Sequence, residues 1–315
     1  MCKIDNINLM IREMESILIG RNKEVTNILK GVIAGGHVLI NDVPGVGKTT
    51  LIKSLAKMMG LSCNRIQFTP DLLPTDILGV SIFNQKTMEF EFKKGPIFSN
   101  VILADEINRA SPKTQSALLQ CMEEGIVSEG VNTYSLQEPF IVLATQNPIE
   151  HEGTFPLPEA QRDRFIISSD IGYPSNDDEI RILKTYKNDT PINNIKVLLT
   201  KEELKEIQSE VKNVEINDKV LKYIIYIIDA TRGNRYLKLG ASVRASIALM
   251  RIAQVTAFMN GRNYVIPDDV KDNVYLVLNH RLVLNSRAYN EKMTVYDIVN
   301  SILRATQVPK VNNHD

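Results

Sequence analysis

The sequence predicts an α/β protein, with a parallel sheet sandwiched by helices and then a small all-α domain. In the first half, short apolar runs alternate with amphipathic helical windows, which is typical of a mostly parallel sheet covered on both faces. The pattern changes at a polar linker around Gly172, Pro174 and Asn176. A length of 315 residues also fits two domains of about 150 residues each. We therefore expect one domain over residues 1–173 and a second over residues 174–315.

The first half contains five apolar runs of strand length. Each run is bounded by polar residues or by glycine and proline. A continuous apolar run of this length is typical of a strand that is buried on both faces. The expected strands are His37–Ile40, Cys63–Phe68, Val101–Ala104, Phe140–Thr145 and Phe165–Ser168.

Two helices between these runs have clear end signals. The window Lys48–Met59 is followed by Gly60, and glycine is a common residue just past the end of a helix. The window Pro112–Glu124 begins with proline after Ser111 and is followed by Gly125. Helices favour proline at their first position and glycine after their last, so both windows are predicted helices.

Two segments interrupt the alternation and are predicted to be β-hairpins. Val80–Lys94 alternates weakly between apolar and polar residues, and Gly125–Gln137 carries a turn at Glu129 and Gly130. Insertions of this kind usually project from the sheet and are free to contact partners.

Beyond the linker the apolar residues recur at helical spacing, and we find no convincing pair of strands. The recurrence is clearest over Val220–Ile228 and Ala245–Met259. Capping-box patterns begin at Thr200 and Thr294, which indicates helix starts there. The second half is therefore predicted to be helical.

Composition excludes several classes of protein. With 43% hydrophobic and 23% charged residues, the chain is neither disordered nor fibrous. Its 37 basic and 37 acidic residues cancel, so it lacks the basic excess of most nucleic-acid binders. Cys2, Cys63 and Cys121 are too scattered for a disulfide framework or a zinc site. No secretory h-region and no apolar run of about 20 residues is found, which predicts a cytoplasmic protein without membrane insertion.

A glycine-rich loop follows the first expected strand and opens the first expected helix. Its glycines allow successive backbone N–H groups to point at a phosphate, and the helix N-terminus adds a positive dipole end. Lys48 would reach the β- and γ-phosphates of ATP, and the Thr49 hydroxyl would hold Mg²⁺. The expected nucleotide-binding residues of this loop are Pro44, Gly45, Val46, Gly47, Lys48, Thr49 and Thr50.

Polar side chains follow two further strands at their carboxyl ends. Asp105 and Glu106 come directly after Val101–Ala104, and adjacent acids there repel each other unless a cation is near. Asp105 would orient Mg²⁺ and Glu106 would polarise the water that attacks the γ-phosphate. Asn147 follows Phe140–Thr145 and would lie at the same edge of a parallel sheet, where its amide would bind this water and the γ-phosphate.

The order of these motifs resembles that of AAA+ ATPases, and most specifically that of the MoxR family. The resemblance extends over nearly the whole chain, from Ile19 to Arg281. It is carried by residues 42–49, 65–74, 105–110, 144–148, 152–161, 163–165 and 240–244.

The resemblance implies roles for further residues. Arg164 corresponds to the arginine finger, which reaches into the nucleotide site of a neighbouring subunit in a ring. Arg244 corresponds to the second sensor, which the lid would press onto the γ-phosphate, and the residue type of Ser242 before it predicts an N-cap. Ile19 and Gly20 correspond to the segment that contacts adenine.

The sequence departs from the family pattern at three positions near these sites. Val243 stands where the family often has proline, which loosens the start of the lid helix but leaves Arg244 in place. Asp42 replaces the first glycine of the phosphate loop. Arg162 stands where an apolar residue is usual, so the finger role is open between Arg162 and Arg164. The alternative for either arginine is a surface ion pair with Glu159 or Asp163.

The function we expect is ATP hydrolysis by a ring-forming chaperone that remodels, assembles or activates partner proteins. The resemblance implies ATP and Mg²⁺ as cofactors, a hexameric homo-oligomer, and as partners a von Willebrand factor A domain protein and a protein client, with no direct nucleic acid. It also implies that Val80–Lys94 faces the pore of the ring or a partner.

Two alternatives stay open. A nucleic-acid motor would need a basic pore loop or an added DNA-binding module, and a non-catalytic nucleotide switch would have lost Glu106, Asn147 or Arg164.

Four other residues have simpler interpretations. His151 lies between two glutamates without a second ligand at metal spacing and is interpreted as part of a solvated turn. His37 opens an apolar strand and is interpreted as structural. Tyr223 and Tyr226 are assigned to the core of the helical domain.

Overall fold

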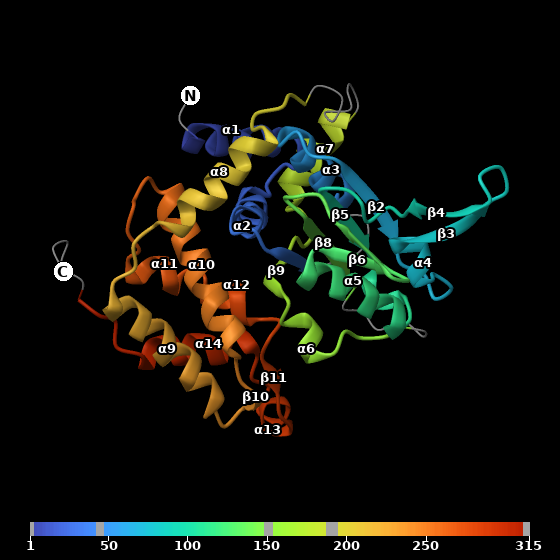
Figure 1. The fold of residues 1–315 in the computed structure, drawn as a ribbon. Coiled ribbons are helices and arrows are strands. Elements are labelled where there is room, and N and C mark those ends of the chain that lie inside the picture. Colours follow the sequence, from blue (N-terminus) through green and yellow to red (C-terminus); the bar gives the residue numbers. More distant parts are fainter. Residues whose placement is uncertain (1–2, 42–46, 148–153, 187–194, 311–315) are drawn as a thin grey trace.

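The structure is a computed structural model that describes residues 3–41, 47–147, 154–186 and 195–310 (Figure 1). A five-stranded sheet in the order β2-β5-β8-β1-β9 lies at the centre of the first half. All neighbouring strands in it are parallel, so the predicted fold class is confirmed. The strands are β1 (His37–Asn41), β2 (Cys63–Gln67), β5 (Val101–Asp105), β8 (Ile141–Gln146) and β9 (Phe165–Asp170).

The strand register aligns the carboxyl ends of the strands along one side of the sheet, which we call the carboxyl edge. The amino ends lie along the opposite side, which we call the amino edge. Asn41 at the end of β1 lies beside Gln146 and Asp170, which end β8 and β9. At the other edge, His37 at the start of β1 pairs with Phe165 at the start of β9. At about 3.3 Å per residue, the carboxyl edge and the amino edge are roughly 13–16 Å apart.

Helices cover both faces of the sheet, because alternate residues of each strand point to opposite sides. Val38 and Ile40 of β1 belong to a cluster with the first three helices, whereas Leu39 belongs to a cluster with α4 and α5. The elements of this part are α1 (Lys3–Ile17), α2 (Asn22–Ile33), α3 (Lys48–Met58), α4 (Pro74–Leu78), a 3₁₀ turn (Ile107–Arg109), α5 (Pro112–Glu124) and α6 (Glu159–Arg162). The predicted ends of α3 and α5 agree with these bounds to within one residue.

One strand differs from its prediction. Within β2 only Ile66 is buried, so the expectation of a strand buried on both faces is wrong here. Both β2 and β9 are outermost strands of the sheet, but helices α2, α10 and α12 cover β9, whereas the polar residues of β2 are only partly covered.

Both predicted hairpins are confirmed. The first consists of β3 (Gly79–Asn84) and β4 (Glu89–Lys94), and it projects away from the sheet (Figure 1). The second consists of β6 (Ile126–Glu129) and β7 (Asn132–Ser135). Phe92 of β4 stacks on Tyr134 of β7 with ring centroids 4.4 Å apart, so the two hairpins contact each other.

The second half is helical, as predicted, and the expected caps are present. Thr200 and Thr294 each accept a hydrogen bond at the start of a helix, and Ser242 does the same for α10. Tyr223 is buried as expected, but Tyr226 is 60% exposed, so its assignment to the core is wrong. The helices are α7 (Asn176–Tyr186), α8 (Lys201–Lys212), α9 (Asp218–Arg232), α10 (Val243–Met259), α11 (Pro267–Lys271), α12 (Val274–Leu278), α13 (Ser286–Asn290) and α14 (Val295–Ala305).

This half also contains a strand pair that the sequence did not indicate. Leu237–Leu239 (β10) pairs antiparallel with Val283–Leu284 (β11). The expectation of no strand pair is therefore wrong. Strands of two or three residues that come from distant segments carry neither a period-2 pattern nor a hairpin turn.

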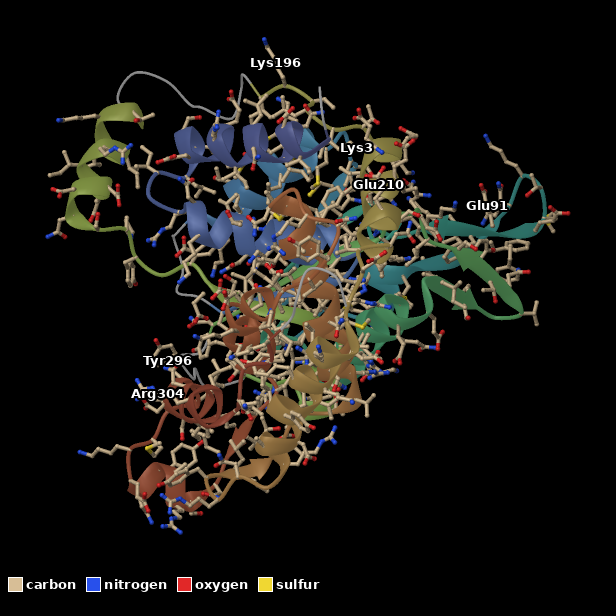
Figure 2. All side chains as sticks on the ribbon, turned by 90° about the vertical axis from the view of Figure 1, so that its left-hand side faces the viewer. Lys3, Glu91, Lys196, Glu210, Tyr296 and Arg304 are labelled. Atoms are coloured by element: carbon tan, nitrogen blue, oxygen red, sulfur yellow. The ribbon has the colours of Figure 1, made fainter. Side chains whose placement is uncertain are left out.

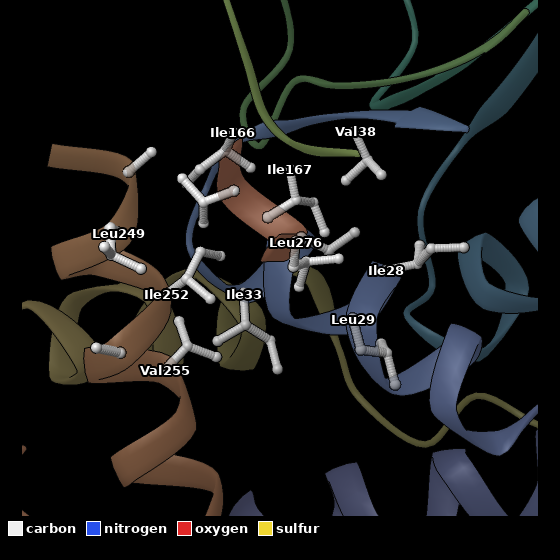
Figure 3. Close-up of a cluster of buried hydrophobic side chains, with 14 of the residues drawn as sticks. Ile28, Leu29, Ile33, Val38, Ile166, Ile167, Leu249, Ile252, Val255 and Leu276 are labelled. Atoms are coloured by element: carbon white, nitrogen blue, oxygen red, sulfur yellow. The ribbon is translucent and has the colours of Figure 1, made fainter. Parts of the chain in front are cut away.

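The helical half packs closely against the sheet half. In Figure 3, side chains of α10 such as Leu249 and Ile252 meet Ile33 of α2 and Ile166 of β9 in one buried cluster. At the surface, Lys3 of α1 lies 2.7 Å from Glu210 of α8, and both are labelled in Figure 2. The division at residues 173/174 stays a prediction. No helix of the described residues is long and apolar enough to span a membrane.

Candidate functional site

The start of α3 lies at the carboxyl edge of the sheet. Residues 42–46, which include the predicted Pro44, Gly45 and Val46, lie outside the described residues. Gly47 precedes the helix with a φ of 87°, a left-handed conformation that favours glycine. A Cβ on Gly47 would be 3.0 Å from the Leu18 side chain. Lys48, Thr49 and Thr50 form the first turn of α3, where N–H groups of a helix are free to bind an anion.

The segment predicted to contact adenine lies next to this turn. Ile19 is buried, and Gly20 has a φ of 76°. A Cβ on Gly20 would be 2.3 Å from an Asp178 carboxylate oxygen, so a larger residue would displace this side chain, and the positive φ also favours glycine. Because the Leu18 side chain lies beside Gly47, the structure brings Ile19 and Gly20 near the start of α3.

The two predicted carboxylates end β5 in a fixed geometry. Glu106 has φ 56° and ψ 50°, a left-handed conformation that is costly for a non-glycine residue and that is enriched at functional sites. The backbone N–H of Glu106 donates to Thr145 Oγ1 over 2.9 Å, and this hydroxyl donates to Asp105 Oδ1 over 2.6 Å. Thr145 of β8 therefore orients both residues, a role that sequence reasoning missed.

Three further side chains hold these carboxylates. Arg65 Nε and Nη2 donate to Asp105 Oδ2 over 3.1 and 2.6 Å. Gln67 Nε2 and Arg109 Nη1 donate to Glu106 Oε2 over 3.2 and 2.9 Å. Arg65 and Gln67 are two residues apart on β2 and so share a face, which is the one signal that could have identified them.

Asn147 follows the end of β8 directly and lies at the same carboxyl edge. Its backbone oxygen accepts a hydrogen bond from Asn108 Nδ2 over 3.3 Å, which ties it to the turn after β5. The structure therefore brings Lys48, Glu106 and Asn147 to one edge of the sheet, as predicted.

The residues at this edge fit a magnesium ion by their chemistry. Mg²⁺ prefers hydroxyl and carboxylate oxygens and keeps several waters. Thr49 and Asp105 offer these groups, and Asp105 is a buried carboxylate that its partners hold in place. Within the described residues, no cluster of three or more His, Cys, Asp or Glu side chains forms another metal site. His151 lies outside the described residues.

The predicted arginines form a second group at the amino edge. Arg164 directly precedes β9, and its Nη2 lies 2.7 Å from Glu123 Oε2. Arg244, in the first turn of α10, pairs with Glu123 Oε1. The structure thus brings Arg164 and Arg244 together, but not to the phosphate loop of their own chain. Within one chain Arg244 lies at the amino edge, because α10 packs against α2 and β9, so its contact with a γ-phosphate stays a prediction.

The ion-pair partner of Arg164 differs from Glu159 and Asp163, the two partners that the sequence suggested. Arg164 pairs with Glu123, whereas Asp163 Oδ1 accepts from Arg281 Nε over 2.7 Å and Asp163 Oδ2 accepts from Ser242 Oγ over 2.8 Å. The Nε of Arg162 is buried and has no hydrogen-bond partner among the described residues. Arg162 is the last residue of α6, whereas Arg164 lies beside Arg244.

His37 has a structural role, as predicted. It is half-buried at the start of β1, where Nδ1 accepts from the Val142 N–H and Nε2 lies 3.0 Å from the Met122 carbonyl oxygen. Burial lowers its pKa to about 4, so the imidazole is neutral near pH 7.

Comparison with known proteins agrees with this arrangement. A family model described as the ATPase family associated with various cellular activities (AAA) matches residues 37–167, and an AAA lid domain model matches residues 229–302. The Chaperone MoxR1 of Mycobacterium tuberculosis is 40% identical over 98% of this chain and 84% of its own length. The chain belongs to the MoxR family of AAA+ ATPases.

Other relatives match this MoxR-family chain over nearly its full length. YeaC of Bacillus subtilis, a protein of uncharacterised function, is 47% identical over 95% of this chain and 93% of its own. A solved structure of a candidate ATPase from Cytophaga hutchinsonii has a TM-score of 0.91 and 43% identity, covering 98% of this chain and 96% of that one. The arrangement of the sheet half and the helical half of this MoxR-family protein is thus shared with a solved structure.

Proposed function

We propose that this chain binds ATP with Mg²⁺ at the carboxyl edge of its sheet and hydrolyses it to remodel or activate a partner protein. The observation that carries the proposal is the convergence of Lys48, the Asp105–Glu106 pair and Asn147 on one edge, beside a helix N-terminus. Membership of the MoxR family supports ATP as the nucleotide.

Each group has a role that follows from its chemistry. The Lys48 ammonium binds the β- and γ-phosphates, and Thr49 with Asp105 holds the magnesium ion, which neutralises phosphate charge when bound. Glu106 accepts the proton of the attacking water. Its left-handed backbone and the bonds from Gln67 and Arg109 fix the direction of its carboxylate. Asn147 orients the water.

The amino-edge arginines act on the nucleotide of a neighbouring subunit in a hexameric ring. Arg164 and Arg244 are separated from their own phosphate loop by the length of the strands, roughly 13–16 Å. A guanidinium at that distance cannot bind its own γ-phosphate, but in a ring the amino edge of one subunit can meet the carboxyl edge of the next. An arginine supplied from another subunit stabilises the charge of the transition state.

Membership of the MoxR family supports the proposed protein partners. One full-length relative is named a chaperone, which supports a protein client, and we extend the proposal to a von Willebrand factor A domain partner. The β3–β4 hairpin is the part of the described residues best suited to contact a client, because Phe83, Met88 and Phe90 are exposed on it.

Two substitutions at the carboxyl edge test the proposal. Lys48→Ala removes the phosphate-binding ammonium, and we expect ATP binding to be lost in isothermal titration calorimetry. Glu106→Gln should bind ATP normally but lower kcat by about 10²–10⁴-fold, because the amide cannot accept the proton. Lys53→Ala is a matched control, since Lys53 is an exposed lysine on the same helix. Normal turnover by the Glu106→Gln protein would exclude Glu106 as the base.

The same Glu106→Gln variant can be used to identify the client protein. A Glu106→Gln protein with ATP is expected to stay bound to its partner, so affinity capture followed by mass spectrometry should enrich a specific protein. Capture that does not depend on ATP, or that the Lys48→Ala protein matches, would argue against a nucleotide-driven chaperone.

A further inference from the structure

We propose that Glu123 is a positioning residue for ATP hydrolysis in a neighbouring subunit. Its carboxylate holds Arg164 of the sheet domain and Arg244 of the helical domain side by side, so that both guanidiniums meet one phosphate group together. This inference rests on the proposed function, since only an assembled nucleotide site would use the pair.

The contacts of Glu123 divide between its two oxygens. Oε2 accepts from Arg164 Nε over 2.9 Å and lies 2.7 Å from Arg164 Nη2, so one carboxylate oxygen faces the Nε–Nη2 side of this guanidinium. Oε1 accepts from Arg244 Nη2. Glu123 comes from the last turn of α5, so three elements that are distant in the sequence meet at one carboxylate.

The charge of Glu123 makes this meeting possible. Two guanidiniums this close repel each other, and a carboxylate between them offsets the repulsion. The effect is reciprocal, because Arg164 first and Arg244 second lower the pKa of Glu123, apart from an opposing effect of desolvation. The pKa of this carboxylate therefore lies below its usual value, and the bridge is present at neutral pH.

Among the residues that the structure describes, the contacts of both arginines leave N–H donors for a phosphate. A guanidinium carries several N–H groups, of which Glu123 uses the Nε–Nη2 side of Arg164 and one Nη2 of Arg244. The site opens into a cavity of about 360 Å³ that Arg251 and the neutral His37 also line. The lining carries more positive than negative charge, which suits a phosphate from outside the chain.

The same carboxylate also joins the two halves of the molecule. Arg164 belongs to the start of β9, whereas Arg244 belongs to α10, and beside them Asp163 binds Ser242 from the first turn of that helix. Any shift of the helical half relative to the sheet therefore changes the spacing of the two guanidiniums. A displacement of about 1 Å at a reacting centre can lower a rate by about 100-fold.

A purely structural ion pair predicts a different outcome for substitutions. The Glu123 side chain is 41% exposed, and exposed ion pairs contribute little to stability, at most about 1 kcal/mol. Removal of Glu123 should therefore leave Tm almost unchanged under either interpretation. Only the positioning role predicts a loss of turnover.

The first experiment measures steady-state ATPase kinetics. Glu123→Ala should lower kcat by about 10–100-fold with KM nearly unchanged, because the variant keeps its own phosphate loop. Glu123→Gln should behave like Glu123→Ala, since an amide has a single acceptor oxygen and cannot hold both arginines. Glu124→Ala is the matched control on the same helix turn, with an exposed carboxylate that binds only Gln120 in the described part of the chain. Wild-type kcat in the Glu123 variants would overturn the proposal.

The second experiment tests whether Glu123 acts across the subunit interface. Glu123→Ala subunits keep an intact nucleotide site, and Glu106→Gln subunits keep an intact amino edge. Mixed rings, verified by co-purification of differently tagged subunits, should hydrolyse ATP faster than the sum of the two separate proteins. An Arg164→Ala plus Glu106→Gln mixture is the positive control.

The failures of the two proposals can be told apart. Mixed rings without a gain, while the positive control shows one, would mean that Glu123 serves its own subunit or only the fold. A wild-type protein without ATPase activity would instead reject the proposed function itself.

Discussion

Single residues at both edges of the sheet are fixed by side chains that come from other strands and helices. At the carboxyl edge, Thr145 bonds both to the Asp105 carboxylate and to the Glu106 backbone. At the amino edge, Glu123 does the same for two arginines. Functional side chains in this molecule are thus oriented by neighbours that are close in space and distant in sequence.

Acid is expected to destabilise the protein through His37. Desolvation lowers the pKa of His37 from about 6.5 to about 4, so the unfolded chain binds a proton at higher pH than the folded chain. The neutral imidazole's contribution is complete above pH 6.5, and stability falls as pH decreases through the window down to about 4. The maximum effect corresponds to about 3 kcal/mol.

The substitution His37→Gln tests this linkage. Glutamine can accept from the Val142 N–H and donate to the Met122 carbonyl oxygen without titrating. We expect urea unfolding of the variant to lose less stability than the wild type between pH 7 and pH 5. Some dependence should remain, since burial also lowers the pKa of His280 well below its usual range. Identical slopes in both proteins would contradict the assignment.

At the scale of elements, local signals set most helix ends. Gly125 ends α5 in a left-handed conformation, and Thr294 with Asp297 forms the capping box of α14. How closely helices approach the sheet is decided by small residues instead. Gly31 of α2 faces β1, and a Cβ there would be only 2.5 Å from Val38 Cγ2.

We therefore expect Gly31→Ala to destabilise the protein despite the better helix propensity of alanine. The added methyl group forces α2 away from β1, and overpacking of this kind costs about 1–3 kcal/mol. Chemical denaturation measures the loss. Gly233→Ala is the control, because nothing lies within 4 Å of its Cβ position and its φ is −97°. Equal stability of the two variants would mean that α2 is not held tightly on the sheet.

At the scale of the whole molecule, one hydrophobic cluster extends through both halves. It joins α1, α2 and the sheet to the helices of the second half, with Leu249 and Leu276 among its buried members (Figure 3). The sheet half and the helical half therefore share a core, which favours cooperative unfolding.

Calorimetry should accordingly show a single thermal transition. Leu249→Ala removes a fully buried side chain of α10, and we expect it to lower the Tm of the whole transition through a loss of about 2–5 kcal/mol. A second peak that alone shifts in this variant would show instead that the helical half unfolds independently.

Much of the fold and part of the site could be predicted from the sequence. Apolar runs and end signals located the strands and helices, and the common direction of parallel strands predicted that Asp105, Glu106 and Asn147 share an edge. Arg65 and Gln67 lie in a segment that resembles the family, but the sequence predicts no role for them, since a polar residue on a strand does not reveal which neighbour it binds.

What the sequence determined by itself were features encoded by neighbours along the chain: the alternation of strands and helices, the phosphate loop before α3, and the carboxylates at the end of β5. Only the tertiary structure decided that Arg244 lies with Arg164 and Glu123 at the amino edge, away from its own phosphate loop. The physical reason is that this choice depends on how α10 packs against α2 and β9. Packing between distant segments is set by the shapes of buried surfaces, which no periodicity or local motif records.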